Sequence, residues 1–200
     1  MAHPWAFAAG ALVGVGGLLW WPPLGLAVWA LMAASLAQEL RWRARARREG
    51  LAARWVIPTS RRWWNSRLAR LGLPLVPPGN ACWEIHVQDD HHWGGDTPED
   101  AARQFRVAYC RDMAHWIASR PPGVALVGST FNRLTPEEAT VIRTAGGSIT
   151  AGAVHPRLAA YMQPVVYRRL QTRLFGGVIS ETPRHDPTRW TTWVVPPQAR

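Results

Sequence analysis

The sequence predicts an α/β protein: an N-terminal two-helix transmembrane hairpin, followed by a compact cytoplasmic domain in which helices flank a small, largely parallel sheet. Three observations support this fold class. Residues 5–38 carry no charged side chain, residues 41–70 hold most of the net charge of +10, and short apolar runs alternate with helix-start signals after residue 80. The expected organisation is a hairpin over 1–40, a juxtamembrane segment and linker over 41–80, and a soluble α/β domain over 81–200.

The hairpin prediction rests on two apolar stretches that a proline pair separates. Residues 5–21 and 24–38 flank Pro22 and Pro23. Proline removes a backbone donor and interrupts a helix, yet it suits the first turn of the next helix. Each stretch, at ~17 residues, covers ~26 Å of a ~30 Å hydrocarbon core, so two spans of this length need some bilayer thinning. The tryptophans beside the prolines are typical of a membrane interface.

Other arrangements of the apolar residues stay open. A single kinked span, a re-entrant loop or a cleaved signal peptide would have a similar composition, although residues 1–4 lack the basic start of a signal peptide. Gly10, Gly14 and Gly17 share roughly one helical face, and such small residues let membrane helices approach closely. We expect this face to close the hairpin, with homo-oligomerisation as the alternative.

A basic segment follows the apolar stretches. Residues 41–70 hold ten arginines against one glutamate, whereas residues 71–200 carry a net charge of only +2. Arginines next to a span mark its cytoplasmic side and attract anionic lipid headgroups. We therefore expect a multi-pass protein of the inner (cytoplasmic) membrane with its soluble domain in the cytoplasm. Nucleic acid would use the same residue types, but a neighbouring span favours lipid. The residues expected to contact lipid are Arg41, Arg43, Arg45, Arg47, Arg48, Arg61, Arg62, Trp63 and Trp64.

The soluble domain follows a linker over 71–80 that is rich in proline and glycine. Two Thr-Pro-Glu sequences, at 97–99 and 135–137, combine a hydroxyl cap, an early proline and first-turn acids, and Glu138 is placed for a capping box. Turn residues bound the short apolar runs between them. The expected order is strand 82–87, helix 97–119, strand 124–127, helix 135–146, strand 148–151, helix 155–174, and edge strands over 178–180 and 190–195.

Ligands of open α/β sheets bind beyond the carboxyl ends of parallel strands, where three polar loops of this chain would meet. The first loop, over 89–96, holds two neighbouring aspartates and two neighbouring histidines. These groups suit a general base or a divalent metal, but a solvated loop has the same composition. Because metal ligands usually come from several elements, no metal site is assigned. The candidate catalytic residues are Asp89, Asp90, His91 and, from the third loop, His155.

The second and third loops offer groups for an anion. Residues 128–133 read Gly-Ser-Thr-Phe-Asn-Arg ahead of a helix, where free backbone amides favour phosphate. A capped strand-to-helix turn is the alternative explanation. No dinucleotide, P-loop, serine-hydrolase or zinc signature is present, so the sequence indicates no particular cofactor. The candidate ligand-binding residues are Ser129, Thr130, Asn132, Arg133 and, from the third loop, Arg157.

Two functions of different kinds fit these observations. The first is a membrane-anchored bacterial accessory protein whose cytoplasmic domain binds a partner protein or a small anionic ligand, a layout typical of parts of transfer and secretion assemblies. The second is a membrane-tethered enzyme acting on a phosphorylated or nucleotide substrate. The enzyme hypothesis predicts that the loop residues converge on one pocket. The binding hypothesis predicts an exposed apolar patch around Trp93 or Trp116.

Overall fold

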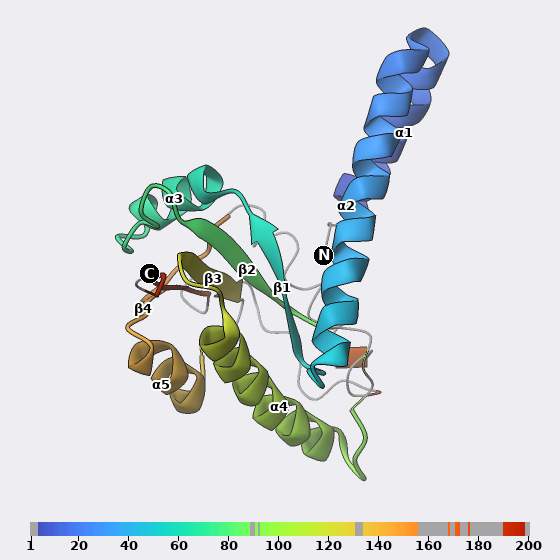
Figure 1. Ribbon diagram of the computed structural model, residues 1–200. Coiled ribbons are helices and arrows are strands. Elements are labelled where there is room, and N and C mark those ends of the chain that lie inside the picture. The colour runs from blue at the N-terminus through green and yellow to red at the C-terminus, as the bar shows by residue number, and fades with distance from the viewer. Residues whose placement is uncertain are drawn as a thin grey trace. The chain divides into compact units, whose positions relative to one another are not determined.

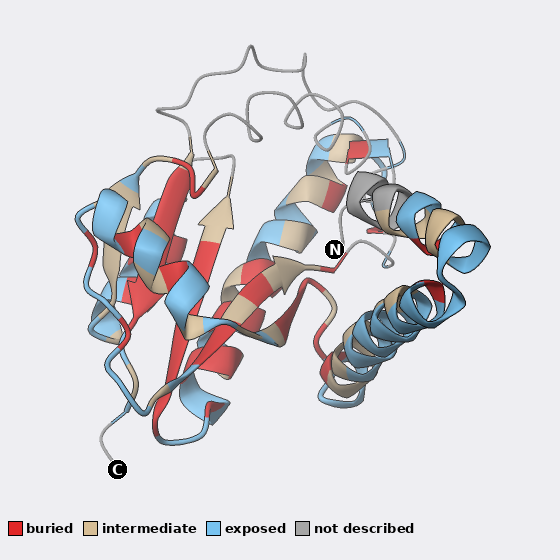
Figure 2. Ribbon diagram, turned by 90° about the horizontal axis from the view of Figure 1, so that it is seen from above, coloured by how far each residue is buried: buried red, intermediate tan, exposed pale blue. Residues whose placement is uncertain are grey.

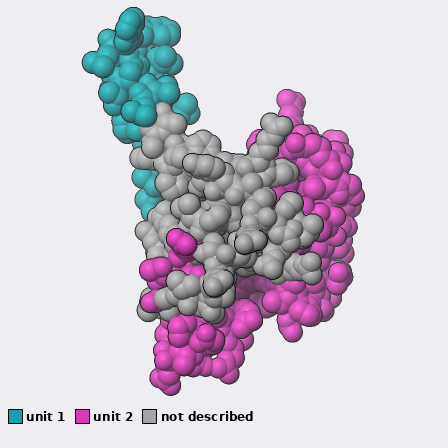
Figure 3. All heavy atoms as spheres, turned by 180° about the vertical axis from the view of Figure 1, so that it is seen from behind, with its two compact units in different colours: residues 1–49 teal, residues 50–200 magenta. Residues whose placement is uncertain are grey.

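The computed structural model describes residues 4–88, 91, 93–130, 134–155, 168, 171–172, 176 and 190–198. The chain forms two compact units, residues 1–49 and residues 50–200 (Figure 3). The first unit is helical, and the second unit holds the sheet. Residues 50–70, which the sequence placed in the juxtamembrane segment, belong to the second unit.

The first unit consists of two helices, α1 (Pro4–Trp20) and α2 (Pro22–Arg48), which are separated at the predicted proline break. α2 is longer than expected, because it continues through the arginines of residues 41–48. Ion pairs four residues apart stabilise this extension: Glu39 binds Arg43 at 2.8 Å, and Glu49 binds Arg45 at 2.7 Å.

The two helices pack closely through glycines. A Cβ atom added at Gly14 would lie 2.7 Å from Nε1 of Trp29, and one added at Gly17 would lie 3.0 Å from the backbone of Gly25. Both distances are too short for an unstrained side chain, so the small residues permit this close approach of α1 and α2. The predicted glycine face therefore lies between the two helices of this unit.

By length and composition, α2 is the one helix among the described residues that could cross a membrane. A shorter apolar helical stretch, Gly10–Trp20, lies in α1. This result supports one candidate span near the N-terminus. The predicted hairpin needs two spans, and the second span stays a prediction.

In the described residues, the second unit is built on one five-stranded sheet (Figure 1). Its strands are β1 (Arg54–Thr59), β2 (Ala81–Val87), β3 (Val124–Thr130), β4 (Ser148–Ala151) and β5 (Thr191–Val195). They lie in the order β1-β2-β3-β5-β4, and of these neighbours β2 and β3 alone pair in parallel. The prediction of a largely parallel sheet is therefore wrong: the sheet is mixed.

Two strands, β5 and β1, make the sheet mixed. β2, β3 and β4 point the same way, as their alternation with helices predicts, but β5 inserts between β3 and β4 and runs against both. β1 was expected to belong to the juxtamembrane segment. It contains Pro58, which a sheet tolerates here because β1 is an edge strand.

The helices with described bounds that accompany the sheet are α3 (Arg61–Arg70), α4 (Pro98–Ser119) and α5 (Pro136–Thr144). The predicted starts of α4 and α5 are confirmed, because the side chains of Thr97 and Thr135 accept hydrogen bonds from backbone N–H groups and Glu138 completes a capping box. Of the expected helix over 155–174, residues 155, 168, 171 and 172 are described: the last three are helical, whereas residue 155 lies in a bend. The expected strand over 178–180 lies outside the described residues.

Helices cover both faces of the sheet: α3 lies on one face, and α4 and α5 lie on the other (Figure 1). Paired residues of neighbouring strands point to the same face, and successive residues of a strand alternate between faces. Trp64 and Leu68 of α3 belong to one buried cluster with Val127 of β3. Buried residues concentrate in the strands between the helices (Figure 2). The two sides are named the α3 face and the α4 face.

Candidate functional site at the carboxyl edge of the parallel strands

The carboxyl ends of β2 and β3 define the edge where the sequence predicts a site. β1 starts at this edge, because Arg54 pairs with Val87. β5 starts there as well, because Thr191 pairs with Thr130. Residues from the starts of β1 and β5 therefore join the ends of β2 and β3 at the place where α/β sheets bind ligands.

On the α3 face, this edge carries aromatic and titratable side chains. The rings of the cross-strand partners Trp55 and His86 stack with their centroids 5.0 Å apart. Deeper in the sheet, Nε1 of Trp64 donates a hydrogen bond to the Glu84 carboxylate at 3.2 Å, and Nε2 of His86 lies 3.6 Å from the same group. Burial raises the pKa of Glu84, and the hydrogen bond from the indole opposes that rise.

We expect Trp64→Phe to destabilise the protein more at neutral pH than at acid pH. The variant keeps an aromatic ring but loses the donor that stabilises ionised Glu84, so the pKa of Glu84 rises further. A carboxyl group with a raised pKa favours the fold while it is protonated, and this contribution is lost as pH rises through the folded pKa. The loss should be about 1–3 kcal/mol at neutral pH. Urea unfolding at both pH values measures it, and an equal loss at both would exclude the hydrogen bond as the cause.

Ser129 and Thr130 lie in β3 and not in a loop, because the strand is longer than the predicted 124–127. Oγ1 of Thr192 donates to the carbonyl of Gly152 at 2.8 Å. Its single proton is thereby used, so the Ser129 hydroxyl donates to Thr192 across 3.0 Å. Ser129 therefore links β3 to β5 within the sheet, a structural role that the phosphate hypothesis did not expect.

His155 lies beside α3. Its ring centroid is 5.2 Å from that of Trp63, and the guanidinium of Arg67 lies 3.8 Å from the centroid of the same indole. Trp63 is 36% exposed, but its neighbour Trp64 is 1% exposed and packs on the sheet. The expectation that Trp64 contacts lipid is therefore wrong, because the apolar side of α3 faces the core of its own unit.

On the α4 face, a line of aromatic rings runs from the loop after β2 towards β1. Ring centroids are 4.5 Å apart for His91 and Trp93, 5.6 Å for Trp93 and Phe105, and 5.4 Å for Phe105 and Tyr109. At the end of this line, Cζ of Arg54 lies 3.2 Å from the centroid of Tyr109, a cation–π contact. This arrangement brings the start of β1 against α4.

Arg54 is buried at this place, and two of its nitrogens have no hydrogen-bond partner in the described parts of the chain. The residue is 3% exposed, and these nitrogens are Nε and Nη2. Burial lowers the pKa of Arg54 to about 9, and the nearby acidic groups of Glu138, Cys110 and Asp112 oppose this shift. The guanidinium still carries its charge at neutral pH, so a buried cation lies at the carboxyl edge of β2 and β3.

Asp112 of α4 fixes the backbone at the start of β1. Its Oδ2 atom accepts hydrogen bonds from the backbone N–H groups of Ala52, Ala53 and Arg54 at 3.0, 2.7 and 3.2 Å. Its Oδ1 atom accepts from Nε and Nη2 of Arg111 at 3.0 and 2.8 Å. The residue is fully buried. This carboxylate therefore couples α4 to β1 and sets the position of Arg54.

The described members of the predicted site do not converge. His91 packs with the aromatic rings of the α4 face, whereas His155 lies by α3 and Ser129 points to the α3 face. The exposed apolar patch is not found where it was expected either, because Trp93 and Trp116 are 7% and 0% exposed. Five predicted residues lie outside the described parts of the chain: Asp89, Asp90, Asn132, Arg133 and Arg157.

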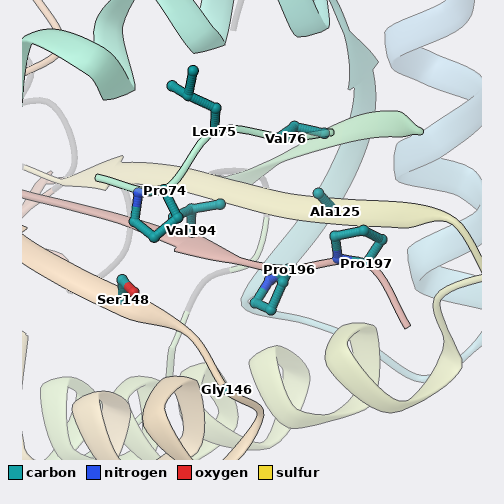
Figure 4. A pocket seen from close by; sticks show the side chains of 9 residues that line it. All are labelled: Pro74, Leu75, Val76, Ala125, Gly146, Ser148, Val194, Pro196 and Pro197. Atoms are coloured by element: carbon teal, nitrogen blue, oxygen red, sulfur yellow. The ribbon is translucent and has the colours of Figure 1, made fainter. Parts of the chain in front are cut away.

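The described parts of the chain offer no metal centre, and the cavity described below is lined by other residues than those predicted for the site. No group of three or more His, Cys, Asp or Glu side chains in these parts could hold a metal ion. A cavity of about 50 Å³ lies at the opposite edge of the sheet, among Pro74, Ala125, Val194 and Pro196 (Figure 4). Its lining is mostly apolar and includes none of the predicted site residues.

Sequence reasoning missed Arg54 and Asp112. The signal for Arg54 was the run Trp-Val-Ile directly after it, which is typical of a strand and would have placed the arginine in a sheet. No local signal marks Asp112, because its hydrogen-bond partners lie about sixty residues away in the sequence.

Comparison with family models, curated proteins and solved structures finds no match for this chain.

Proposed function

We propose that the chain is a membrane-anchored accessory protein that holds a binding module, residues 50–200, at the cytoplasmic face of the inner membrane. In this proposal α1 and α2 form a multi-pass anchor, and the arginines at the end of α2 lie among anionic lipid headgroups. The module binds a partner protein or a small anionic ligand.

The exposed apolar surface of the first unit carries this proposal. Leu19, Leu26 and Leu31 are 79%, 64% and 70% exposed, and nearly all of the most apolar part of α2 is exposed. Burying apolar surface is worth roughly 25 cal/mol per Å², so hydrocarbon stabilises such a surface and water does not. The core helix of a soluble protein would instead bury one face against its neighbours.

The arginine-rich end of α2 supports the orientation. Five arginines fall within residues 41–48, at the carboxyl end of the helix. Cations are favoured there by the helix dipole, and each contributes ~1 kcal/mol next to an anionic bilayer. Because arginines next to a span stay on the cytoplasmic side, the module that follows is expected to lie in the cytoplasm.

Leu31→Arg tests the anchor, with Leu75→Arg as the matched control. Leu31 lies in the apolar part of α2, whereas Leu75 is a similarly exposed leucine of the second unit, at 53%. A charge at the centre of a span costs about 2.5–3.5 kcal/mol. We expect the unchanged protein and Leu75→Arg to stay in the membrane pellet after an alkaline carbonate wash, and Leu31→Arg to be extracted in much larger amount.

Two results would contradict the anchor. Extraction of the unchanged protein by carbonate would exclude an integral membrane protein. A mature protein whose mass lacks the N-terminal apolar residues would identify them as a signal sequence. For the orientation, a reporter fused after Arg200 that is active only in the periplasm would overturn the cytoplasmic assignment.

No contact among the described residues favours the alternative, a membrane-tethered enzyme. Its described candidates, His91, Ser129 and His155, are distributed over the two faces of the sheet, and the Ser129 hydroxyl is engaged with Thr192. A binding module is therefore the function that the geometry supports best.

A further inference from the structure

The buried guanidinium of Arg54 is arranged as a receptor for an anion. One flat side of it stacks on Tyr109, with Cζ 3.2 Å from the ring centroid. The nitrogens that have no acceptor among the described residues, Nε and Nη2, form one edge of the planar group. This edge presents two parallel N–H donors, a fork that matches the two oxygens of a carboxylate.

A buried charge with unused donors is costly unless an anion satisfies it. The protein holds Arg54 in place from both sides of its backbone, because its N–H donates to Asp112 at 3.2 Å and its carbonyl accepts from Nε1 of Trp116 at 3.3 Å. The site is therefore fixed before any ligand binds, and a fixed fork loses little entropy on binding.

The charges around Arg54 select the kind of anion. The described groups that act on its guanidinium are acidic or neutral: Glu138, Cys110 and Asp112. The neighbouring carboxyl groups repel any anion, and they repel a dianion more strongly than a monoanion. A monoanion with two coplanar oxygens fits both the charge and the shape of the fork.

We propose that the module binds the carboxylate group of a small organic acid through the Nε and Nη2 atoms of Arg54, with Tyr109 supporting the guanidinium. The inference rests on the proposed binding role of residues 50–200 and names its ligand class. The site lies on the α4 face, at the carboxyl edge of β2 and β3, where sheets of this kind bind ligands.

Titration of the full-length chain with acetate tests the proposal. The chain is labelled with nitrogen-15 in its arginine side chains, and the Nε–H signal of Arg54 is recognised by its ring-current shift from Tyr109. Sodium acetate is added, with sodium chloride at equal ionic strength as the reference. We expect the Arg54 signal to move downfield and to saturate in acetate, and to stay in place in chloride. Equal responses to the two salts would overturn the proposal.

Two variants and a second anion sharpen the test. Arg54→Lys keeps the charge but lacks the fork, so acetate affinity should fall at least roughly tenfold, since one charge-assisted hydrogen bond is lost. Arg106→Met removes an exposed arginine of α4 and should bind acetate like the unchanged protein. Inorganic phosphate should bind at least roughly tenfold more weakly than acetate. Tighter binding of phosphate than of acetate would overturn the choice of a carboxylate.

The carbonate wash separates this inference from the proposed anchor. Arg54→Lys is expected to stay in the membrane pellet, because Arg54 belongs to the second unit. An unchanged chain that stays in the membrane but does not respond to acetate refutes the ligand and leaves the anchor standing. A chain that binds acetate but is washed from the membrane would support the ligand and refute the anchor.

Discussion

Asp112→Ala is expected to lower the free energy of unfolding by about 3–5 kcal/mol, the largest effect of any single substitution considered for this chain. The carboxylate is fully buried and accepts hydrogen bonds from three consecutive backbone N–H groups, those of residues 52–54. Alanine leaves these donors without an acceptor. It also removes the link that holds the start of β1 against α4. Urea unfolding of the detergent-solubilised chain, followed by tryptophan fluorescence, measures the loss.

Arg111→Ala is the matched control for this substitution. Arg111 pairs with the same carboxylate at 2.8 Å, but its side chain is 59% exposed, so its loss should cost at most about 1 kcal/mol. Asp112→Asn keeps one acceptor oxygen and should fall between the two. If Asp112→Ala and Arg111→Ala destabilise the chain equally, the backbone hydrogen bonds are not the main contribution of Asp112.

The parts of the fold that could be predicted are those fixed by neighbours in sequence. Thr97 and Thr135 cap helices through bonds that span three residues, and the proline pair separates α1 from α2 at once. The common direction of β2, β3 and β4 follows from their alternation with helices. The position of β5 does not, because it depends on pairing with β3 across some sixty residues of sequence.

The candidate site was less predictable, because its contacts join distant segments and both faces of the sheet. Trp64 and Arg54 both lie in a basic, tryptophan-rich stretch whose composition suggested a lipid surface. The structure places Trp64 against Glu84 and Arg54 against Tyr109. Composition could not predict these contacts, because the same local sequence allows an arginine to pack on an aromatic ring or to bind a lipid headgroup.

For Gly128, the sequence and the structure predict different effects of a substitution. The sequence placed Gly128 at the start of a loop ahead of a helix, where free backbone amides would favour an anion. The structure places it within β3, where a Cβ atom would lie 2.4 Å from Cζ2 and 2.6 Å from Cε2 of Trp193. Trp193 is 1% exposed, so the indole has little room to move. The structure therefore predicts a loss of stability on substitution, not a loss of ligand binding.

Gly128→Ala is accordingly expected to lower the free energy of unfolding by about 1–3 kcal/mol through overpacking. Gly94→Ala is its control, since nothing lies within 4 Å of a Cβ atom there, and it should change stability by at most about 0.5 kcal/mol. Trp193→Phe replaces the indole, whose Cζ2, Cε2 and Nε1 atoms the new methyl group would meet, with a smaller ring. Gly128→Ala and Trp193→Phe combined should therefore cost less than the sum of the single substitutions, by at least about 1 kcal/mol. Additive losses in this double-mutant cycle would show that the close approach of Gly128 and Trp193 is not what makes glycine necessary in β3.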